Sequence, residues 1–343
     1  MSMTIQQALG LIQRGVSINS EDAEAVFTQI MLGQASDAQI GALLMGLSIR
    51  GETPEIIAGA ALAMRSAATC IKPSSEGLLD TCGTGGSGTS TFNISTTVAL
   101  VVAACGVPVA KHGNRAISSK SGSADVLEAL GVRLDIPVQK VAECIDAIGI
   151  GFLFAPGHHP AMKHAAGPRR ELGMRSIFNL LGPLTNPAGA EYQVLGVFAR
   201  DKLELVAEAL NHLGVRRALV VHGRDGMDEI TTTGITDAVW VERGAEPRAF
   251  EIDPAAFGMP YAKAAELDGG DAQSNAVILR DILGGKQGGR RDIVLLNAAA
   301  ALWVAGHADG IAQGLRLAAE TIDSGKAGDK LNELVAFTQA ATA

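Results

Sequence analysis

The sequence predicts an α/β protein in which a small all-helical domain precedes a larger α/β domain with a mostly parallel central sheet. Residues 1–72 carry helix signals with no strand between them. After Pro73, short apolar runs alternate with glycine-rich loops and capped helices, a rhythm typical of a parallel sheet. The chain has 343 residues, whereas one hydrophobic core stops growing at roughly 250–300, so more than one domain is expected.

Composition argues against a disordered, a nucleic-acid-binding or a membrane protein. Hydrophobic residues make up 47% of the chain, which is too many for a disordered protein. The net charge of −8 argues against a general nucleic-acid surface. The N-terminus lacks the basic start and apolar run of a signal peptide, and the apolar stretch 98–105 is too short to cross a bilayer. We therefore expect a cytoplasmic protein that binds neither nucleic acid nor membrane.

The number and spacing of the cysteines are also typical of a cytoplasmic protein. Cys70, Cys82, Cys105 and Cys144 include no C-x-x-C pair and match no zinc spacing. Four cysteines in a chain of this length do not form a disulfide framework, so we expect them to be reduced and mostly buried.

Capping signals place the N-terminal helices. Thr4 can cap the first helix and Ser20 the second. Ser36 and Gln39 have the spacing of a capping box for the third. Thr53 followed by Pro54 begins the fourth, because proline is favoured at the first helical position. These four short helices predict a helical domain over 1–72, and the segment 160–187 is expected to pack on it.

The larger domain is predicted over 73–159 and 188–343. Residues 78–81 form an apolar run that enters a glycine cluster, residues 95–105 form a helix that ends at Gly106, and residues 107–110 form a strand. A capped helix follows over 123–130. Later strands are predicted at 192–198, 217–221 and 238–241, and later helices at 201–213, 273–283 and 291–305.

The glycine-rich segment 83–88 carries the strongest local signal for chemistry. A glycine loop between a strand and a helix exposes backbone N–H groups beside the positive end of the helix dipole, which together cradle phosphate. The segment also matches G-x-G-x-x-G, but a dinucleotide fold requires an acid after the second strand, where this chain has Lys111. A simple tight turn is the structural alternative.

A basic loop follows the second strand. It runs from Lys111, His112, Gly113, Asn114 and Arg115 to the hydroxyl-rich segment 118–123. Such a loop can wrap an anionic ligand that carries hydroxyl groups. Ligands bind at the carboxyl ends of strands in open α/β sheets, where this loop and the glycine loop are both predicted to lie. A solvated basic loop remains the alternative, and no P-loop signature is present.

Two adjacent acids suggest a metal. Asp228 and Glu229 would point to opposite faces of a regular strand, so both can approach one ion only from a turn, which the nearby glycines favour. Carboxylate oxygens suit Mg²⁺ that also contacts substrate phosphates. Without a pyrophosphate site elsewhere, an exposed acidic turn is the better explanation.

Two further groups of residues, at 158–170 and 182–187, do not by themselves indicate a function. The histidines at 158, 159 and 164 match no zinc motif. Arg169, which follows them, can bind a substrate carboxylate with two hydrogen bonds, but spacing alone does not decide whether it does. The segment 182–187, with Pro183 and Pro187, predicts a rigid turn that suits a hinge between domains as well as a binding role.

Together the motifs resemble the anthranilate phosphoribosyltransferase family. The matching segments are 80–86, 93–96, 111–115, 119–123, 178–187 and 228–230, in the family's order and spacing over nearly the whole chain. The resemblance implies a nucleoside phosphorylase/phosphoribosyltransferase-like fold and a homodimer formed through the helical domains. It also implies transfer of the 5-phosphoribosyl group from phosphoribosyl pyrophosphate (PRPP) to anthranilate, in tryptophan biosynthesis, with two Mg²⁺ ions expected beside bound PRPP.

The resemblance also implies residue roles. The catalytic residues would be Lys111, His112 and Asn114. The anthranilate site would comprise Gly83, Asn114 and Arg169, with His112 and Pro183 along the same path, and the Mg²⁺ ligands would be Ser95, Asp228 and Glu229. The PRPP site would comprise Gly83, Gly86, Ser87, Thr91, Asn93, Ile94, Ser95, Thr96, Lys111, His112, Gly113, Asn114, Arg115, Ala116, Ile117, Ser118, Ser119 and Ser123.

One residue departs from the family pattern. The family usually has Asp after the Gly-Gly pair, whereas this chain has Ser87, which cannot supply that charge. Two other functions remain possible from the sequence. A pyrimidine nucleoside phosphorylase would need no Mg²⁺ on a pyrophosphate, so Asp228-Glu229 argues against it. A non-catalytic relative that binds nucleic acid should have a basic surface, which an acidic chain lacks.

Overall fold

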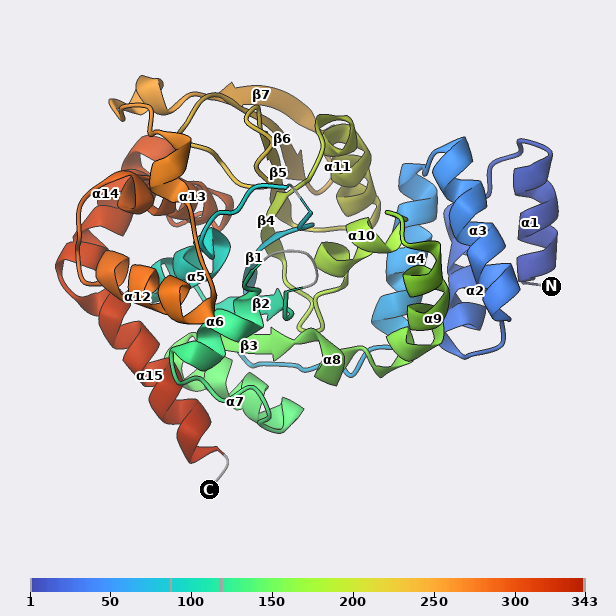
Figure 1. The fold of residues 1–343 in the computed structure, drawn as a ribbon, viewed down its shortest axis with the longest axis horizontal. Helices are drawn as coiled ribbons and strands as arrows, with labels where there is room; N and C mark the ends of the chain where they lie inside the picture. Colours follow the sequence, from blue (N-terminus) through green and yellow to red (C-terminus); the bar gives the residue numbers. More distant parts are fainter. Residues whose placement is uncertain (1, 87, 117–119, 342–343) are drawn as a thin grey trace.

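The computed structural model describes residues 2–86, 88–116 and 120–341. A helical domain and a larger α/β domain lie side by side, and the N-terminus is at the far end of the helical domain (Figure 1). The predicted fold class is confirmed, because the described strands form one seven-stranded sheet in the order β3-β2-β1-β4-β5-β6-β7. The strands are β1 (Leu79–Gly83), β2 (Val109–Gly113), β3 (Ile150–Phe154), β4 (Tyr192–Gly196), β5 (Arg217–Gly223), β6 (Thr236–Glu242) and β7 (Arg248–Ile252).

The helical domain follows the capping signals closely. Thr4 and Ser36 both form complete capping boxes, and Thr53 caps the helix that starts at Pro54. One cap prediction was wrong. Asn19 rather than Ser20 caps the second helix, because the Asn19 side chain accepts the N–H of Asp22 at 2.8 Å. The four helices are α1 (Ile5–Gln13), α2 (Ser20–Met31), α3 (Asp37–Arg50) and α4 (Pro54–Ser66).

The sheet is parallel from β3 to β5 and antiparallel at β6 and β7. Strands β3 and β7 were not predicted from the sequence. The exposed edge strand β7 carries only one buried residue, Ile252, so it lacks a continuous apolar run. Strand β3 is a short apolar run directly after a helix, and short apolar runs do not distinguish strand from helix.

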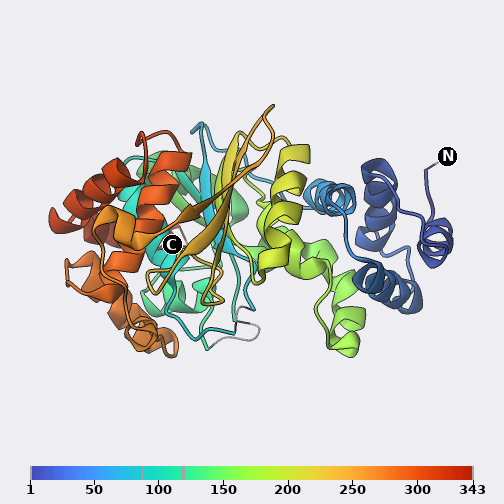
Figure 2. The ribbon, with the colours of Figure 1, turned by 90° about the horizontal axis from the view of Figure 1, so that it is seen from above.

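Helices cover both faces of the sheet (Figure 2). Along β5, Leu219 and Val221 join a core with α5, α13, α14 and α15, whereas Ala218 and Val220 join a core with α11 and the helical domain. This alternation reflects the period of two along a strand. Helices of this domain are α5 (Ile94–Ala104), α6 (Ser123–Ala129), α7 (Val138–Ile148), α8 (Ala155–His158), α11 (Leu203–His212), α12 (Ala272–Leu283), α13 (Gly289–Val304), α14 (Ile311–Asp323) and α15 (Lys326–Ala340).

A middle segment runs back to the helical domain. Its elements are η1 (Pro160–Met162), α9 (Lys163–Leu172), α10 (Phe178–Leu181) and η2 (Gly182–Thr185). Helix α9 contacts α2 and α3, and both α10 and η2 contact α4. The boundaries placed at residues 72, 160 and 187 stay a prediction. The remaining short helices are η3 (Arg200–Lys202), η4 (Pro254–Phe257) and η5 (Ala264–Leu267).

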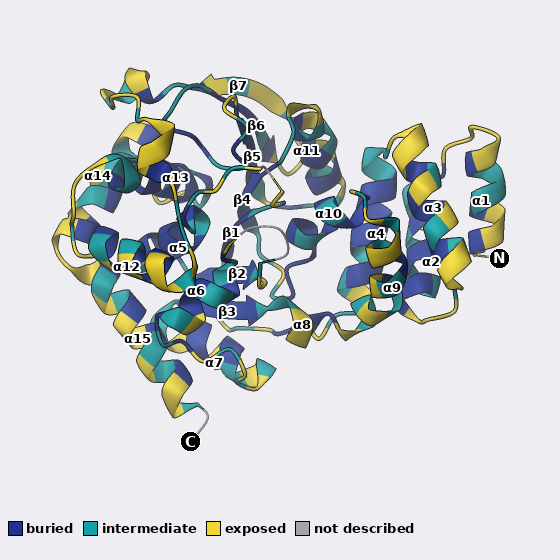
Figure 3. Ribbon diagram, in the orientation of Figure 1, coloured by how far each residue is buried: buried dark blue, intermediate teal, exposed yellow. Residues whose placement is uncertain are grey.

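Burial follows this arrangement (Figure 3). The strands β1, β2 and β4 are buried along nearly their whole length, and exposed residues lie on the outer faces of the surrounding helices. Among the residues that the structure describes, no helix combines the length and apolarity of a membrane span.

Candidate active site at the carboxyl ends of β1, β2 and β4

The glycine loop and the basic loop meet as predicted. They follow β1 and β2, which are paired in parallel, so both loops leave the sheet at the same edge. Helix α5 begins at Ile94, a short segment after the glycine loop, with Asn93 as its N-cap residue, and its first backbone N–H groups face this edge. Ser87 and the segment 117–119, which were also predicted to bind PRPP, lie outside the described residues.

Two glycines admit the acidic turn that follows β5. Gly83 ends β1 and is paired in register with Gly196 at the end of β4. A Cβ on Gly83 would collide with the Asp228 carboxylate, and a Cβ on Gly196 would collide with the Asp228 backbone carbonyl. The turn that carries Asp228 can therefore lie directly over the ends of both strands only because they end in glycine.

The two acids accept hydrogen bonds from different segments, the glycine loop and the first turn of α5. Asp228 Oδ2 accepts the N–H of Gly85 at 2.8 Å, and Glu229 Oε1 accepts the N–H of Ser95 at 3.2 Å. Burial, and then repulsion from Asp228, raises the pKa of Glu229 to about 8. The predicted turn geometry is confirmed, since residues 224–226 and 228–229 form turns and bends between β5 and β6. No group of three or more His, Cys, Asp or Glu among the described residues is placed to hold a metal by itself.

A buried lysine lies beside this acidic pair. Lys111 is 3% exposed and lies on β2. Its Nζ donates to the Thr81 carbonyl at 2.6 Å and lies 3.5 Å from Ser95 Oγ. Thr81 Oγ1 in turn donates to the Ser95 carbonyl at 2.9 Å. These contacts hold a cation at the base of α5, next to Glu229, whose pKa it lowers against the effect of burial.

A buried carboxyl in β1 joins the basic loop to the middle segment. Asp80 is fully buried in β1, and its oxygens accept the His112 N–H at 3.2 Å and the Asn186 Nδ2 at 2.8 Å. Asn186 also donates to the Ala110 carbonyl at 2.7 Å. Burial raises the pKa of Asp80 to about 6, and Lys111 opposes that shift. Asn186, in the turn at 182–187, is thereby hydrogen-bonded to both β1 and β2 near the start of each strand.

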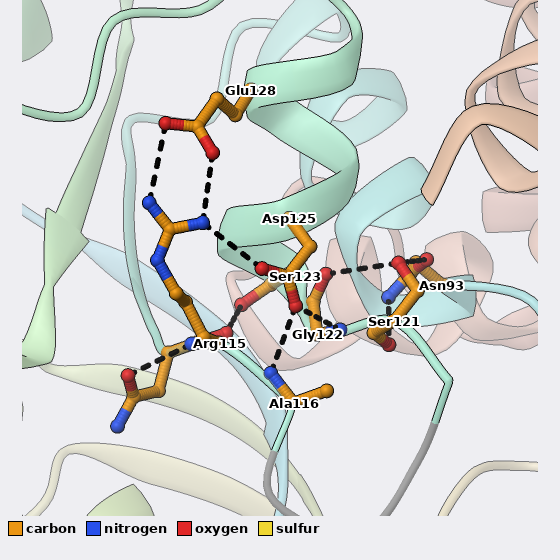
Figure 4. A network of polar contacts seen from close by, with 9 residues as sticks. Asn93, Arg115, Ala116, Ser121, Gly122, Ser123, Asp125 and Glu128 are labelled. Atoms are coloured by element: carbon orange, nitrogen blue, oxygen red, sulfur yellow. Dashed lines mark hydrogen bonds and ion pairs between the residues drawn. The ribbon is translucent and has the colours of Figure 1, made fainter. Parts of the chain in front are cut away.

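The basic loop is held from within by α6 (Figure 4). Asp125 Oδ2 accepts the N–H groups of Ala116 and Gly122, each at 2.9 Å. Arg115, which is also predicted to bind PRPP, directs its guanidinium at the carboxylates of Asp125 and Glu128, at 3.0 and 2.8 Å. A Cβ at Gly122 would collide with the backbone of residues 114–116, so the loop closes tightly.

The remaining predicted PRPP residues lie in the same two loops or at the start of α5. The Asn93 side chain donates to the Ser121 carbonyl at 3.1 Å and so joins the N-terminus of α5 to the basic loop. Ser123 Oγ donates to the Asn114 carbonyl at 3.3 Å, and a Cβ at Gly113 would collide with that hydroxyl. Gly86 lies in the glycine loop, Thr91 follows it, and Ile94, Ser95 and Thr96 form the first turn of α5.

Two buried histidines, His112 and His159, lie in contact near the end of β2. The rings of His112 and His159 have centroids 5.1 Å apart, and the Nε2 atoms of both lack a hydrogen-bond partner among the described residues. Burial, and then the neighbouring histidines, lowers the pKa of His112 to about 3. Burial likewise lowers the pKa of His159 to about 4. Both imidazoles are therefore neutral at pH 7.

Arg169 lies on α9, away from the two loops in the sequence. It is half-buried, its guanidinium carbon lies 5.0 Å from the centroid of the Phe178 ring, and burial lowers its pKa. The described residues offer it no ion pair, and none of its hydrogen bonds joins it to Asn114 or Gly83. The structure thus brings the glycine loop, basic loop and acidic turn together, and leaves Arg169 on the neighbouring element.

Some site residues were not predicted from the sequence. The spacing of Asp125, three residues after Gly122, is that of a helix-capping acid and could have identified it. Arg175 donates to the Gly86 carbonyl at 2.6 Å and stacks on Phe198, but nothing in its local sequence marks it. The role of Gly196 could not be predicted from the sequence either, because glycine occurs at the ends of strands for many structural reasons.

Comparison with known proteins identifies the family of this chain. Residues 6–68 match the helical bundle domain of a glycosyl transferase family, and residues 75–328 match its a/b domain. A relative from Geobacter sp. (strain M21), named anthranilate phosphoribosyltransferase, is 52% identical over 98% of this chain and 99% of its own length.

Solved structures extend the comparison. The crystal structure of anthranilate phosphoribosyltransferase from Thermus thermophilus is 46% identical, has a TM-score of 0.92, and covers 97% of this chain and 99% of that one. The enzyme from Saccharomyces cerevisiae in complex with PRPP and Mg is 25% identical with a TM-score of 0.87, over 98% of both chains. The chain therefore belongs to this glycosyl transferase family and, within it, to the anthranilate phosphoribosyltransferases.

Proposed function

We propose that the chain transfers the 5-phosphoribosyl group from PRPP to the amine of anthranilate, giving N-(5-phosphoribosyl)anthranilate and pyrophosphate, a step of tryptophan biosynthesis. The observation that carries the proposal is the meeting of three distant segments. Asp228 contacts Gly85, Glu229 contacts Ser95, and Lys111 reaches the same serine. Phosphate-binding N–H groups, oxygen ligands for a metal and a buried cation thus share one edge of the sheet.

The donor set fits Mg²⁺. Ser95, Asp228 and Glu229 offer only oxygen atoms, which Mg²⁺ prefers, and too few of them to enclose an ion without phosphate oxygens. We propose that these residues hold Mg²⁺ together with PRPP, with two ions in the full complex. Bound Mg²⁺ would neutralise the charge that develops on the pyrophosphate as it departs.

The PRPP residues act mainly by orientation. Displacement at the anomeric carbon needs the leaving group neutralised and the nucleophile aligned. Lys111 supplies a fixed cation, and the glycine loop and the first turn of α5 supply backbone N–H groups. The proposed site comprises Gly83, Gly86, Ser87, Thr91, Asn93, Ile94, Ser95, Thr96, Lys111, His112, Gly113, Asn114, Arg115, Ala116, Ile117, Ser118, Ser119 and Ser123.

Arg169 is the proposed anchor for the anthranilate carboxylate, with Asn114 and Gly83 nearer the reacting carbon. A half-buried guanidinium that no described carboxylate pairs with is available for a planar carboxylate. The arylamine of anthranilate is neutral at pH 7, so it needs no strong base. The neutral rings of His112 and His159 suit the uncharged ring and amine of anthranilate, whose negative charge lies on its carboxylate.

We also propose a homodimer formed through the helical domains and a cytoplasmic location. Val16, Leu32, Met45 and Ile49 are exposed large hydrophobic residues of the helical domain, and a buried interface would cover such side chains. The four cysteines are unpaired, which suits a reducing compartment.

The test follows anthranilate fluorescence with PRPP and Mg²⁺, beside controls that lack each one. Loss of fluorescence that requires both PRPP and Mg²⁺ is the expected result. Unchanged fluorescence, in a protein that still binds PRPP by calorimetry, would show that anthranilate is not the acceptor. Phosphorolysis of a nucleoside by the same protein would instead indicate a phosphorylase.

A further inference from the structure

A segment from the C-terminal half of the chain lies behind the glycine loop. The N–H of Phe92 donates to the Leu267 carbonyl at 3.3 Å, and the N–H of Gly269 donates to the Ser90 carbonyl at 2.7 Å. Between them, Thr91 and Asp268 form an antiparallel bridge. Residues 267–270 therefore pair with residues 90–92, directly before the start of α5.

This pairing requires a glycine at position 269. A Cβ there would lie 2.6 Å from the Phe92 nitrogen and 2.7 Å from the Thr91 carbonyl oxygen. Both are backbone atoms, which cannot move aside as the end of a flexible side chain can. The backbones of residues 267–270 and 90–92 are therefore too close together for any side chain at position 269.

A buried asparagine completes the contact. Asn275 is 1% exposed and lies in the first turn of α12. Its Oδ1 accepts the N–H of Gly270 at 2.8 Å, and its Nδ2 donates to Asn93 Oδ1 at 2.9 Å. Because the Gly270 N–H can only donate, it fixes which end of the Asn275 amide faces Asn93.

The hydrogen bond from Asn275 determines the orientation of the Asn93 side-chain amide in the same way. With its oxygen facing the Asn275 donor, its Nδ2 is directed at the Ser121 carbonyl, 3.1 Å away in the basic loop (Figure 4). Reversing the Asn93 amide would set two donors against each other and leave the Ser121 carbonyl facing an oxygen. The donors therefore run in one direction, from Gly270 through Asn275 and Asn93 to Ser121.

We propose that Asn275 is a positioning residue for PRPP, which acts through Asn93 to hold the N-terminus of α5 and the basic loop at a fixed separation. The inference rests on the proposed function, since it assigns both segments to PRPP. Asn275 itself lies behind the site and contacts no substrate. Anthranilate, whose proposed anchor Arg169 lies on α9, should be bound independently of this residue.

The test replaces Asn275 with Asp in the full chain, because Asp has nearly the same shape and, when ionised, cannot donate to Asn93. We expect KM for PRPP to rise about 10-fold, as for the loss of ~1.4 kcal/mol, and KM for anthranilate to change less than about twofold. Gln273→Glu is the matched control, because it adds the same charge at an exposed position of the same helix.

A pH profile separates positioning from general damage to the fold. A protonated carboxyl at position 275 regains an O–H donor toward Asn93, and burial raises the pKa of such a group. The ratio of variant to wild-type KM for PRPP should therefore fall toward one as the pH is lowered from 8 to 6. A ratio that stays constant across this range would overturn the proposal.

A double-mutant cycle covers the case in which Asn275→Asp does not fold. Asn275→Ala and Asn93→Ala should each weaken PRPP binding, measured by calorimetry, and the double variant should be no weaker than Asn93→Ala alone. Additive losses would overturn the proposal. Wild-type protein that binds no PRPP would instead contradict the proposed function, and the inference would fall with it.

Discussion

The Asp228 carboxylate accepts a 2.8 Å hydrogen bond from the backbone N–H of Gly85, which lies 143 residues earlier in the chain. An amide that could bind a phosphate oxygen is thus aimed at a carboxylate oxygen. The contact places a proposed metal ligand directly against the glycine loop, so that the metal ligand and the proposed phosphate-binding loop can contact the same substrate.

Replacing Asp228 with Asn tests the charge of this carboxylate. The amide oxygen of Asn can still accept from Gly85, so the loop should keep its conformation and thermal unfolding should change little. The loss of one anionic oxygen should weaken Mg²⁺ binding and reduce kcat/KM by about 100-fold or more. Steady-state kinetics over a Mg²⁺ titration measure this, and an unchanged Mg²⁺ requirement would contradict the assignment.

Replacing Arg169 with Ala should act on one substrate only. A charged hydrogen bond contributes about 1.5–3 kcal/mol, so KM for anthranilate should rise by roughly 10- to 100-fold while KM for PRPP stays nearly constant. Arg170→Ala is the control, because Arg170 is the exposed neighbour on the same helix. Equal losses for the two substrates would show that Arg169 does not anchor anthranilate.

The buried pair His112 and His159 should make stability depend on pH. Each pKa is lower in the folded than in the unfolded protein, so the unfolded state binds more protons below pH 6.5. Stability from these groups is complete above pH 6.5 and decreases as the pH falls toward 4, by about 1.4 kcal/mol per pH unit for each histidine. The raised pKa of Asp80 acts in the opposite direction between about pH 4 and 6.

The histidine contribution is isolated by comparing variants. The free energy of unfolding of wild type and His112→Gln should converge as the pH falls from 7 to 5, because only the wild type loses the His112 contribution. The exposed His307, changed to Gln, is the control and should leave the difference constant. A constant difference for His112→Gln as well would mean that His112 is not held neutral.

The exposed apolar residues of the helical domain give a prediction about assembly. Ile49 is 75% exposed, and a charge there would be costly inside an interface. Ile49→Asp should shift the protein from dimer to monomer in light scattering at micromolar concentration. Val277→Asp, at a 60% exposed position on α12, should leave the mass unchanged. A monomeric wild type would contradict the proposed dimer.

The sequence alone was sufficient wherever the cause of a structure lies within a few residues. Capping boxes at Thr4 and Ser36 depend on groups three positions apart. The proposed phosphate-binding loop depends on glycines between a strand and a helix that are close together in the sequence. The parallel order of β1 and β2 follows from one helix between two strands. These features predicted the fold class and the two loops of the site without reference to the rest of the chain.

Only the tertiary structure decided which distant groups meet. Gly196 appears in the sequence as a strand ending, yet its missing side chain is what admits Asp228. Arg115 was expected to face PRPP, but Asp125 and Glu128 compete for its charge. Asn275 gains its importance from the single atom of Asn93 that it contacts. Close approach and hydrogen-bond direction depend on positions in space, and residues far apart in the chain carry no local sign of them.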